Sequence, residues 1–120
     1  MTTAFLTLSP TVTAETAIAR LKAEAPILDI IDYIYVVDED ETLLGVVSIR
    51  DLLTAPSHQR LSEIQSQRLV SVKLGEDQHE VIDAFAKYGF RALPVVDEQN
   101  HLKGVIGFRS VLEVLAPDAG

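Results

Sequence analysis

The sequence predicts a mixed α/β domain made of two copies of one unit, each a strand, a helix, a β-hairpin and a second helix. The stretch 35–53 returns at 94–112 with a constant shift of 59 positions, and nine of the nineteen aligned residues are identical. In each copy two apolar runs flank a short polar stretch, a pattern typical of a hairpin, and the second run leads into a helical pattern. We therefore interpret the chain as an internal duplication.

The two copies differ in the length of one connection. Residues 6–21 align with 70–85 at a shift of 64, so the first copy carries five extra residues between Leu21 and Tyr35. We divide the chain into a first repeat, 1–60, and a second repeat, 61–120, which together form one compact module. A chain of this length can bury roughly two thirds of its unfolded surface in a single core.

The amino-acid composition limits the classes of molecule that the chain is expected to bind. The chain is 48% hydrophobic, carries a formal charge of −8 and contains no cysteine. The negative charge disfavours nucleic acid and favours cations or basic partners. No apolar run approaches the ~20 residues that cross a bilayer, so we expect no direct membrane insertion. The absence of cysteine removes disulfides and thiolate metal sites and fits a cytosolic location.

The first copy opens with a short strand at 5–8 that Pro10 ends. A helix follows, with Thr11 or Thr13 as the candidate N-cap and Ala25-Pro26 as its end. Its apolar residues fall on one helical face; they are Ala14, Ala17, Ile18 and Leu21.

The matching helix of the second copy has clearer boundaries. Asp77 can cap its start, with Glu80 as the partner in a capping box, and Gly89 is well placed to stop it. The expected buried stripe consists of Val81, Ile82 and Phe85.

The five extra residues lie in the segment 27–34, where Asp29 and Asp32 interrupt a run of apolar residues. One interpretation is a helix end whose carboxylates point to water while the isoleucines pack. The other is that these carboxylates are oxygen ligands for a hard cation, since Mg²⁺ keeps several waters and needs few protein ligands.

The two hairpin turns are predicted at 38–42 and 97–101. Asp and Asn suit such turns because their side chains satisfy nearby backbone donors. The first turn nevertheless holds four successive acids, beginning with Asp38 and Glu39, and their repulsion would be relieved by a bound cation or a basic partner. A solvated turn and a metal site that includes Asp38 and Glu39 are the two interpretations of this stretch.

A further constellation, Ser48-Ile-Arg-Asp51, stands where a strand gives way to a helix. Ser48 and Asp51 can cap that helix. Asp51 could also accept both hydroxyls of a ribose, while Arg50 and the amides of the helix start could hold a phosphate. The second copy has Gly107 and Ser110 at the two matching positions, so only the first copy offers the ribose chemistry.

Enzymatic function is not expected. Three histidines, His58, His79 and His101, are scattered in polar contexts without metal-ligand or catalytic-triad spacing. The sequence also has no glycine-rich phosphate loop.

Two copies of strand, helix, VVDE, a turn and L-x-G-V-V/I, with S-x-x-D in the first, resemble a CBS domain pair, the module named after cystathionine beta-synthase. The resemblance runs from about Phe5 to Leu115. Within that family the first-copy insert, SIRDLL and EDQHEVIDAFAKYGFRALPVVDE are most similar to the cytosolic CBS region of MgtE-type magnesium transporters. The resemblance implies two pseudo-twofold related units with clefts between them, and a cytosolic domain of an inner-membrane protein whose other domains are its partners.

Three functions follow from the resemblance and stay open. One is Mg²⁺ sensing that gates transport through rearrangement of a dimer. The second is adenine-nucleotide (AMP or ATP) sensing, with Asp51 on the ribose, the backbone of 6–8 and 34–35, including Tyr35, against the base, and Arg50 or Arg109 near phosphate. The third is a dimerisation module without a ligand.

A homodimer is expected in each case, because the last helices of the two copies carry more apolar side chains than so small a domain can hide. These are Leu52, Leu53, Val111, Leu112 and Leu115.

Overall fold

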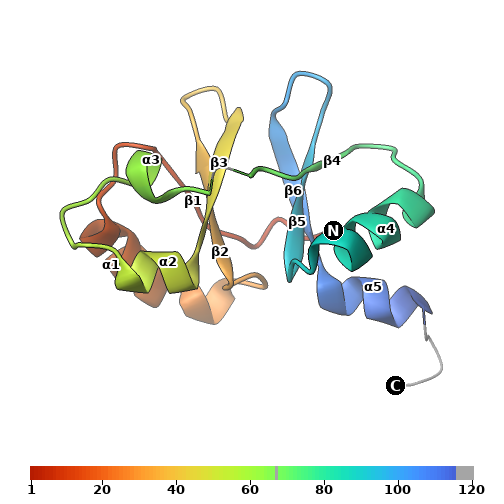
Figure 1. Ribbon diagram of the computed structural model, residues 1–120, viewed down its shortest axis with the longest axis horizontal. Helices are drawn as coiled ribbons and strands as arrows, with labels where there is room; N and C mark the ends of the chain where they lie inside the picture. Colours follow the sequence, from red (N-terminus) through yellow and green to blue (C-terminus); the bar gives the residue numbers. More distant parts are fainter. Residues whose placement is uncertain (67, 116–120) are drawn as a thin grey trace.

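The computed structural model describes residues 1–66 and 68–115, the last two of them by their backbone alone. It contains two three-stranded sheets whose hairpins stand side by side, with the helices arranged along their outer sides and below (Figure 1). In the part of the chain that is described, no helix has the length and apolar character needed to cross a membrane. Two repeated units of mixed α/β structure confirm the predicted fold class.

The sheet of the first copy has three strands, with β2 in the middle. Strand β1 lies parallel to β2, and β2 pairs antiparallel with β3. Its elements are β1 (Thr7–Leu8), α1 (Ala14–Glu24), the 3-10 helix η1 (Ala25–Ile27), β2 (Tyr33–Val37), β3 (Leu43–Ser48) and α2 (Ile49–Thr54), followed by the short helix α3 (Leu61–Ile64).

The second copy repeats this order and the same strand pairing. Its elements are β4 (Val72–Lys73), α4 (Gln78–Tyr88), β5 (Ala92–Val96), β6 (Leu102–Gly107) and α5 (Phe108–Leu115). Only residues 89–91 connect α4 to β5, whereas 25–32 connect α1 to β2. The five extra residues therefore lie between the first helix and the hairpin, as predicted.

The helix boundaries follow the local signals. Helix α1 starts after Thr13, whose hydroxyl accepts a hydrogen bond from the amide three residues on. Helix α4 starts after Asp77, whose carboxylate accepts from the His79 amide at 2.9 Å rather than from the Glu80 amide of a capping box. It ends at Gly89, which has a φ of +67°. That left-handed conformation costs glycine little because it has no Cβ.

The hairpin tips of the two copies are joined by an equivalent pair of hydrogen bonds. The Leu43 amide donates to the Asn100 carbonyl at 2.9 Å, and the Leu102 amide donates to the Glu41 carbonyl at 3.0 Å. Each donor and acceptor matches the other pair at the shift of 59, so the two copies are related by a pseudo-twofold axis that passes between the tips.

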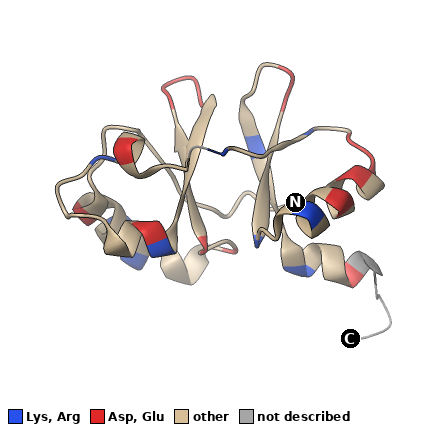
Figure 2. Ribbon diagram, viewed as in Figure 1, with Lys and Arg blue, Asp and Glu red and all other residues tan. Residues whose placement is uncertain are grey.

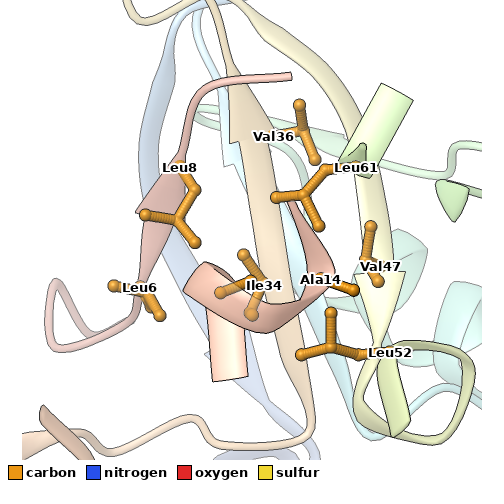
Figure 3. Packing of buried hydrophobic residues seen from close by; sticks show 9 residues of the cluster. Leu6, Leu8, Ala14, Ile34, Val36, Val47, Leu52 and Leu61 are labelled. Carbon is orange, nitrogen blue, oxygen red and sulfur yellow. The ribbon is translucent and has the colours of Figure 1, made fainter. Parts of the chain in front are cut away.

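Buried side chains form three clusters: one in each copy and one between the two sheets. The first-copy cluster joins side chains of the sheet, of α1 and α2, and of α3 (Figure 3). Its buried members are Leu6, Leu8, Ala14, Ala17, Ile34, Val36, Val47, Leu52 and Leu61. Strand alternation turns Tyr33 and Tyr35 the other way, toward the second copy.

Candidate functional site

A cleft between the copies, here called the first cleft, is lined by aromatic and apolar side chains. Its walls come from the start of β2, the middle of β3, the linker before β4 and the start of β5. The lining residues are Tyr33, Tyr35, Val46, Val70, Phe90, Ala92, Leu93 and Pro94.

The aromatic side chains of this cleft are in contact with one another. The rings of Tyr33 and Phe90 lie 6.5 Å apart and nearly perpendicular, and Tyr88 stacks on Phe90 at 5.8 Å. The Tyr33 hydroxyl accepts a hydrogen bond from the Arg91 amide at 3.2 Å, which fixes the ring across the gap between the copies. The space between these side chains has a volume of about 20 Å³, which holds one water, so a flat heteroaromatic ring can lie against these aromatic side chains only if the walls move apart.

The hydroxyl of Tyr35 is a polar group with no partner in this apolar setting. Tyr35 is fully buried, and its oxygen has no hydrogen-bond partner among the described residues. Burial raises the pKa of the Tyr35 phenol far above its ordinary value, and the nearby Tyr33 and Asp32 raise it further. The hydroxyl therefore stays protonated and is available as a donor and an acceptor.

The Ser48–Asp51 constellation adjoins the first cleft. The β2–β3 register places Ser48 directly opposite Tyr33. The Ser48 hydroxyl accepts a hydrogen bond from the Asp51 amide at 3.1 Å and so caps α2. The side chains of Arg50 and Asp51 are exposed in the first turn of α2. Capping therefore occupies the Ser48 hydroxyl and leaves the Asp51 carboxylate and the Arg50 guanidinium facing solvent beside the cleft.

A second cleft lies at the pseudo-equivalent end of the second copy. It is lined by Asp29, Ile30, Asp32, Arg91, Gly107, Phe108, Arg109 and Leu112. The predicted nucleotide-binding residues are therefore divided: Tyr35, Ser48, Arg50 and Asp51 belong to or adjoin the first cleft, whereas Arg109 belongs to the second.

The second cleft brings Asp29 and Asp32 together with two arginines. Asp32 and Arg91 occupy matching positions, and their carbonyls accept the amides that open α2 and α5, at 3.0 and 2.8 Å. Asp29 also accepts a hydrogen bond from the Thr2 hydroxyl at 2.6 Å. The charges of Arg91 and Arg109 offset those of the two carboxylates and weaken their attraction for a cation.

The expectation that the isoleucines around these acids pack inward is wrong for two of them. Ile30 is buried, but Ile27 and Ile31 are 75% and 52% exposed. The segment is also not a simple helix end, because η1 stops at Ile27 and the chain continues without regular structure to Asp32.

The other predicted metal ligands, Asp38 and Glu39, lie at the opposite end of β2. Six residues of extended chain from Asp32 to Asp38 span roughly 20 Å, so the two pairs do not form one site. One Asp38 oxygen accepts the amides of Asp40 and Thr42, both at 2.9 Å, which is the role expected of a turn residue. Figure 2 shows acidic residues gathered on both hairpin tips. In 1–66 and 68–115 no three acidic or histidine side chains are grouped as metal ligands.

Sequence reasoning missed three residues of the clefts: Tyr33, Phe90 and Arg91. Tyr33 carried a signal, because it stands two residues before Tyr35 and shares its face of the strand. The two others lie in the short connection after Gly89, whose approach to β2 depends on the packing of one copy against the other.

The family comparison is consistent with this geometry. The model of the CBS domain matches residues 1–58 and again 61–117.

Similar proteins include magnesium transporters. The magnesium transporter MgtE of Thermus thermophilus is 40% identical over 119 residues, which are 99% of this chain and 26% of that protein. A solved cytosolic domain of the Mg²⁺ channel MgtE in complex with ATP is 40% identical, with a TM-score of 0.89 over 92% of this chain and 44% of that chain. A solved soluble part of a magnesium transporter is 33% identical, with a TM-score of 0.92 over 98% of this chain and 46% of that one. The chain spans about a quarter of the length of the curated transporters that it matches.

Proposed function

The chain belongs to the CBS domain family, and on that premise we propose that it is the cytosolic regulatory CBS-pair module of a magnesium transporter. In this role it senses intracellular Mg²⁺ and gates transport through rearrangement of a dimer, and it has no catalytic activity of its own. The observation that carries the proposal is the match to magnesium transporters along 99% of the chain.

Adenine-nucleotide binding in the first cleft belongs to the same proposal. The exposed Asp51 carboxylate can accept both hydroxyls of a ribose, and Arg50 can hold a phosphate. Tyr33 and Phe90 offer rings against which a base can pack. The unpartnered Tyr35 hydroxyl is enclosed by protein, so it reaches the polar edge of the base only if the walls of the first cleft move apart. The solved relative in complex with ATP supports this choice of ligand.

Magnesium sensing requires ligands from more than one chain or domain. The described residues offer at most pairs of carboxylates, such as Asp29 with Asp32 and Asp38 with Glu39, and Mg²⁺ bound through its water shell needs only one or two from each partner. Ions that bridge acidic surfaces of two subunits, or of this module and a neighbouring domain, favour the compact arrangement only if they bind it more tightly than the open one. Such a site is weak and accepts several small divalent ions.

Thermal unfolding of the chain with ATP, AMP, Mg²⁺ or matched NaCl tests the proposal. A nucleotide at 100 times its dissociation constant adds ~2.7 kcal/mol to the free energy of unfolding. Millimolar Mg²⁺ is expected to stabilise the protein more than NaCl of equal ionic strength, and the double variant Asp29→Asn, Asp32→Asn to lose part of that excess. If NaCl reproduces the whole effect of Mg²⁺ and neither nucleotide shifts the transition, the chain is a dimerisation module without these ligands.

A further inference from the structure

A polar pocket lies beside the tips of the two hairpins, which stand next to each other in Figure 1. This pocket, here called the tip pocket, has a volume of about 260 Å³. Sites for drug-sized ligands have roughly 300–1,000 Å³, so the tip pocket suits a smaller molecule. Its lining residues are Thr3, Phe5, Thr7, Val37, Glu41, Leu102 and Lys103. None of these residues lines either of the two clefts described above.

The pseudo-equivalent place on the other side of the tips is closed by a side chain. There the Asn100 side-chain amide donates to the Leu43 carbonyl at 2.9 Å, while the Leu43 amide donates to the Asn100 carbonyl. Asn100 therefore satisfies both backbone groups of Leu43. At the shift of 59, Glu41 is the counterpart of Asn100 and Leu102 is the counterpart of Leu43.

Glu41 cannot close the tip pocket in the same way. The Leu102 amide donates to the Glu41 carbonyl at 3.0 Å. Since the amide and the carbonyl of one strand residue point to the same side of the strand, the Leu102 carbonyl also faces the first hairpin tip. An ionised glutamate has no hydrogen to donate to that carbonyl. In the described part of the chain the Leu43 carbonyl receives a side-chain donor and the Leu102 carbonyl does not.

The backbone conformation of Glu41 points to a role for its carboxylate. Glu41 has a φ of +63° and Asn100 a φ of +67°, both in the left-handed region. Asparagine tolerates this conformation better than glutamate does, because its short side chain bonds to local backbone groups. A glutamate at this position therefore costs stability that an asparagine would retain.

The groups of the tip pocket match the three parts of a small zwitterion. The Glu41 carboxylate and the Leu102 carbonyl are two acceptors in one pocket, which suits the several hydrogens of a primary ammonium group. The Lys103 side chain is 48% exposed and lies at 3.9 Å from an Asp97 oxygen, so it can turn toward a ligand carboxylate. Phe5 and Val37 offer apolar contacts. These apolar walls and the Lys103 charge disfavour Mg²⁺, which prefers oxygen ligands and water on all sides.

We propose that the tip pocket binds a free α-amino acid with an aliphatic side chain, such as leucine. The ligand ammonium group donates to the Glu41 carboxylate and the Leu102 carbonyl, in the place that the Asn100 amide takes on the other side. The ligand carboxylate pairs with Lys103, and the aliphatic side chain packs on Phe5. This site is separate from the first cleft and takes a different class of ligand from the nucleotide proposed there.

Titration of the isotope-labelled chain with leucine, followed through its amide NMR signals, tests the proposal. Leucine is expected to shift the signals of Leu102 and Lys103 in a saturable way. Isoamylamine lacks the carboxylate and isocaproate lacks the ammonium group. Each is expected to bind at least about tenfold more weakly than leucine, because it loses one charge-assisted interaction.

Two substitutions exchange residues between the copies. Glu41→Asn is expected to weaken leucine binding at least about tenfold, because the carboxylate is lost and the new amide can donate to the Leu102 carbonyl. Glu39→Gln, which removes a charge from the same turn outside the pocket, is the matched control and should change the affinity little. Lys103→Leu, which introduces the residue found at Leu44, is expected to lower the affinity for leucine to about that for isoamylamine.

Three results would overturn the proposal. The absence of a saturable shift with leucine means that the tip pocket takes no amino acid. Equal affinities of Glu41→Asn and Glu39→Gln for leucine mean that the Glu41 carboxylate does not hold the ammonium group. The same shifts on addition of Mg²⁺, or displacement of leucine by ATP, mean that the pocket holds an inorganic ion or that leucine enters a nucleotide cleft.

Discussion

The hydroxyl of Tyr35 is a fully buried polar group without a partner among the described residues. An unsatisfied buried hydroxyl costs about 1–3 kcal/mol, so Tyr35→Phe is expected to raise the free energy of unfolding of the ligand-free protein by about 1 kcal/mol. Urea denaturation measures the change, and the same variant is expected to bind ATP more weakly. A loss of stability in Tyr35→Phe would mean that the hydroxyl has a partner, such as a bound water.

The same hydroxyl makes stability depend on pH at the alkaline end. The folded-state pKa of Tyr35 is raised above its ordinary value of 10.0, so the unfolded chain releases this proton more readily than the folded one. The free energy of unfolding that depends on the protonated Tyr35 phenol is therefore fully present below pH 10 and is lost as the pH rises above 10. Between pH 9 and 11 the wild type is therefore expected to lose more free energy of unfolding than Tyr35→Phe, as measured by urea denaturation at each pH. Equal losses in the two proteins would contradict this expectation.

At the residue level, the sequence allowed us to predict the roles of side chains that act on residues close to them in the chain. Ser48 was identified as a cap and Asp77 as another because an N-cap acts on amides two or three residues away. Arg109 was grouped with Asp51 by analogy between the copies, and the structure places them at different clefts. The position of a side chain relative to the other copy depends on long-range packing, which spacing along the chain does not reveal.

Helix α3 follows the first copy in the sequence, yet its Leu61 side chain packs in the core of that copy and stabilises it. Leu61→Ala is expected to reduce the free energy of unfolding by about 2–5 kcal/mol, because Leu61 is fully buried in the first core and its loss leaves a cavity. Leu44→Ala, at a strand residue that is 39% exposed, is the matched control and should cost much less. Urea denaturation of both variants checks the difference, and similar costs would show that α3 is not a lid on this core.

The elements themselves were largely predictable, because hydrophobic periodicity and cap residues act within a few positions. The order of strand, helix, hairpin and helix, the five extra residues of the first copy and the end of α4 at Gly89 are confirmed. The burial of single residues was less predictable. Leu52 and Val111, two of the five apolar residues on which the expected dimer was based, are only 0% and 6% exposed and lie in the cores of their own copies.

At the scale of the whole molecule, a homodimer is still expected. Leu53 and Leu112, at matching positions of α2 and α5, are 65% and 48% exposed, and an apolar groove beside Leu112 includes Phe85 and Phe108. The side chain of Leu115 lies outside the described residues. Sedimentation velocity is expected to show a dimer that Leu53→Asp combined with Leu112→Asp converts to a monomer. A wild-type monomer at high protein concentration, with and without Mg²⁺, would contradict the expectation.

The two copies have the same backbone fold, but the side chains at their clefts differ in chemistry. Copy one places Ser48 and Asp51 beside an aromatic cleft. At the matching positions of copy two, Gly107 lines the second cleft and Ser110 lines a separate apolar pocket beside α5. The pseudo-twofold axis relates the backbones of the two copies, but the side chains at their clefts differ and so suit different ligands. The sequence predicted this asymmetry from the aligned residues. It did not predict that Asp29 and Asp32 line one cleft together with Arg91 and Arg109, because that arrangement requires both copies to be folded against each other.

Isothermal titration of ATP into the chain tests this asymmetry, and with it the proposed regulatory role, most directly. One site per chain is expected, because only the first copy has a carboxylate, Asp51, at the start of the helix that follows its hairpin. Asp51→Ala should remove the binding, while Ser110→Ala, the matched change in the other copy, leaves it intact. Two equal sites per chain, or an affinity unchanged by Asp51→Ala, would contradict the account.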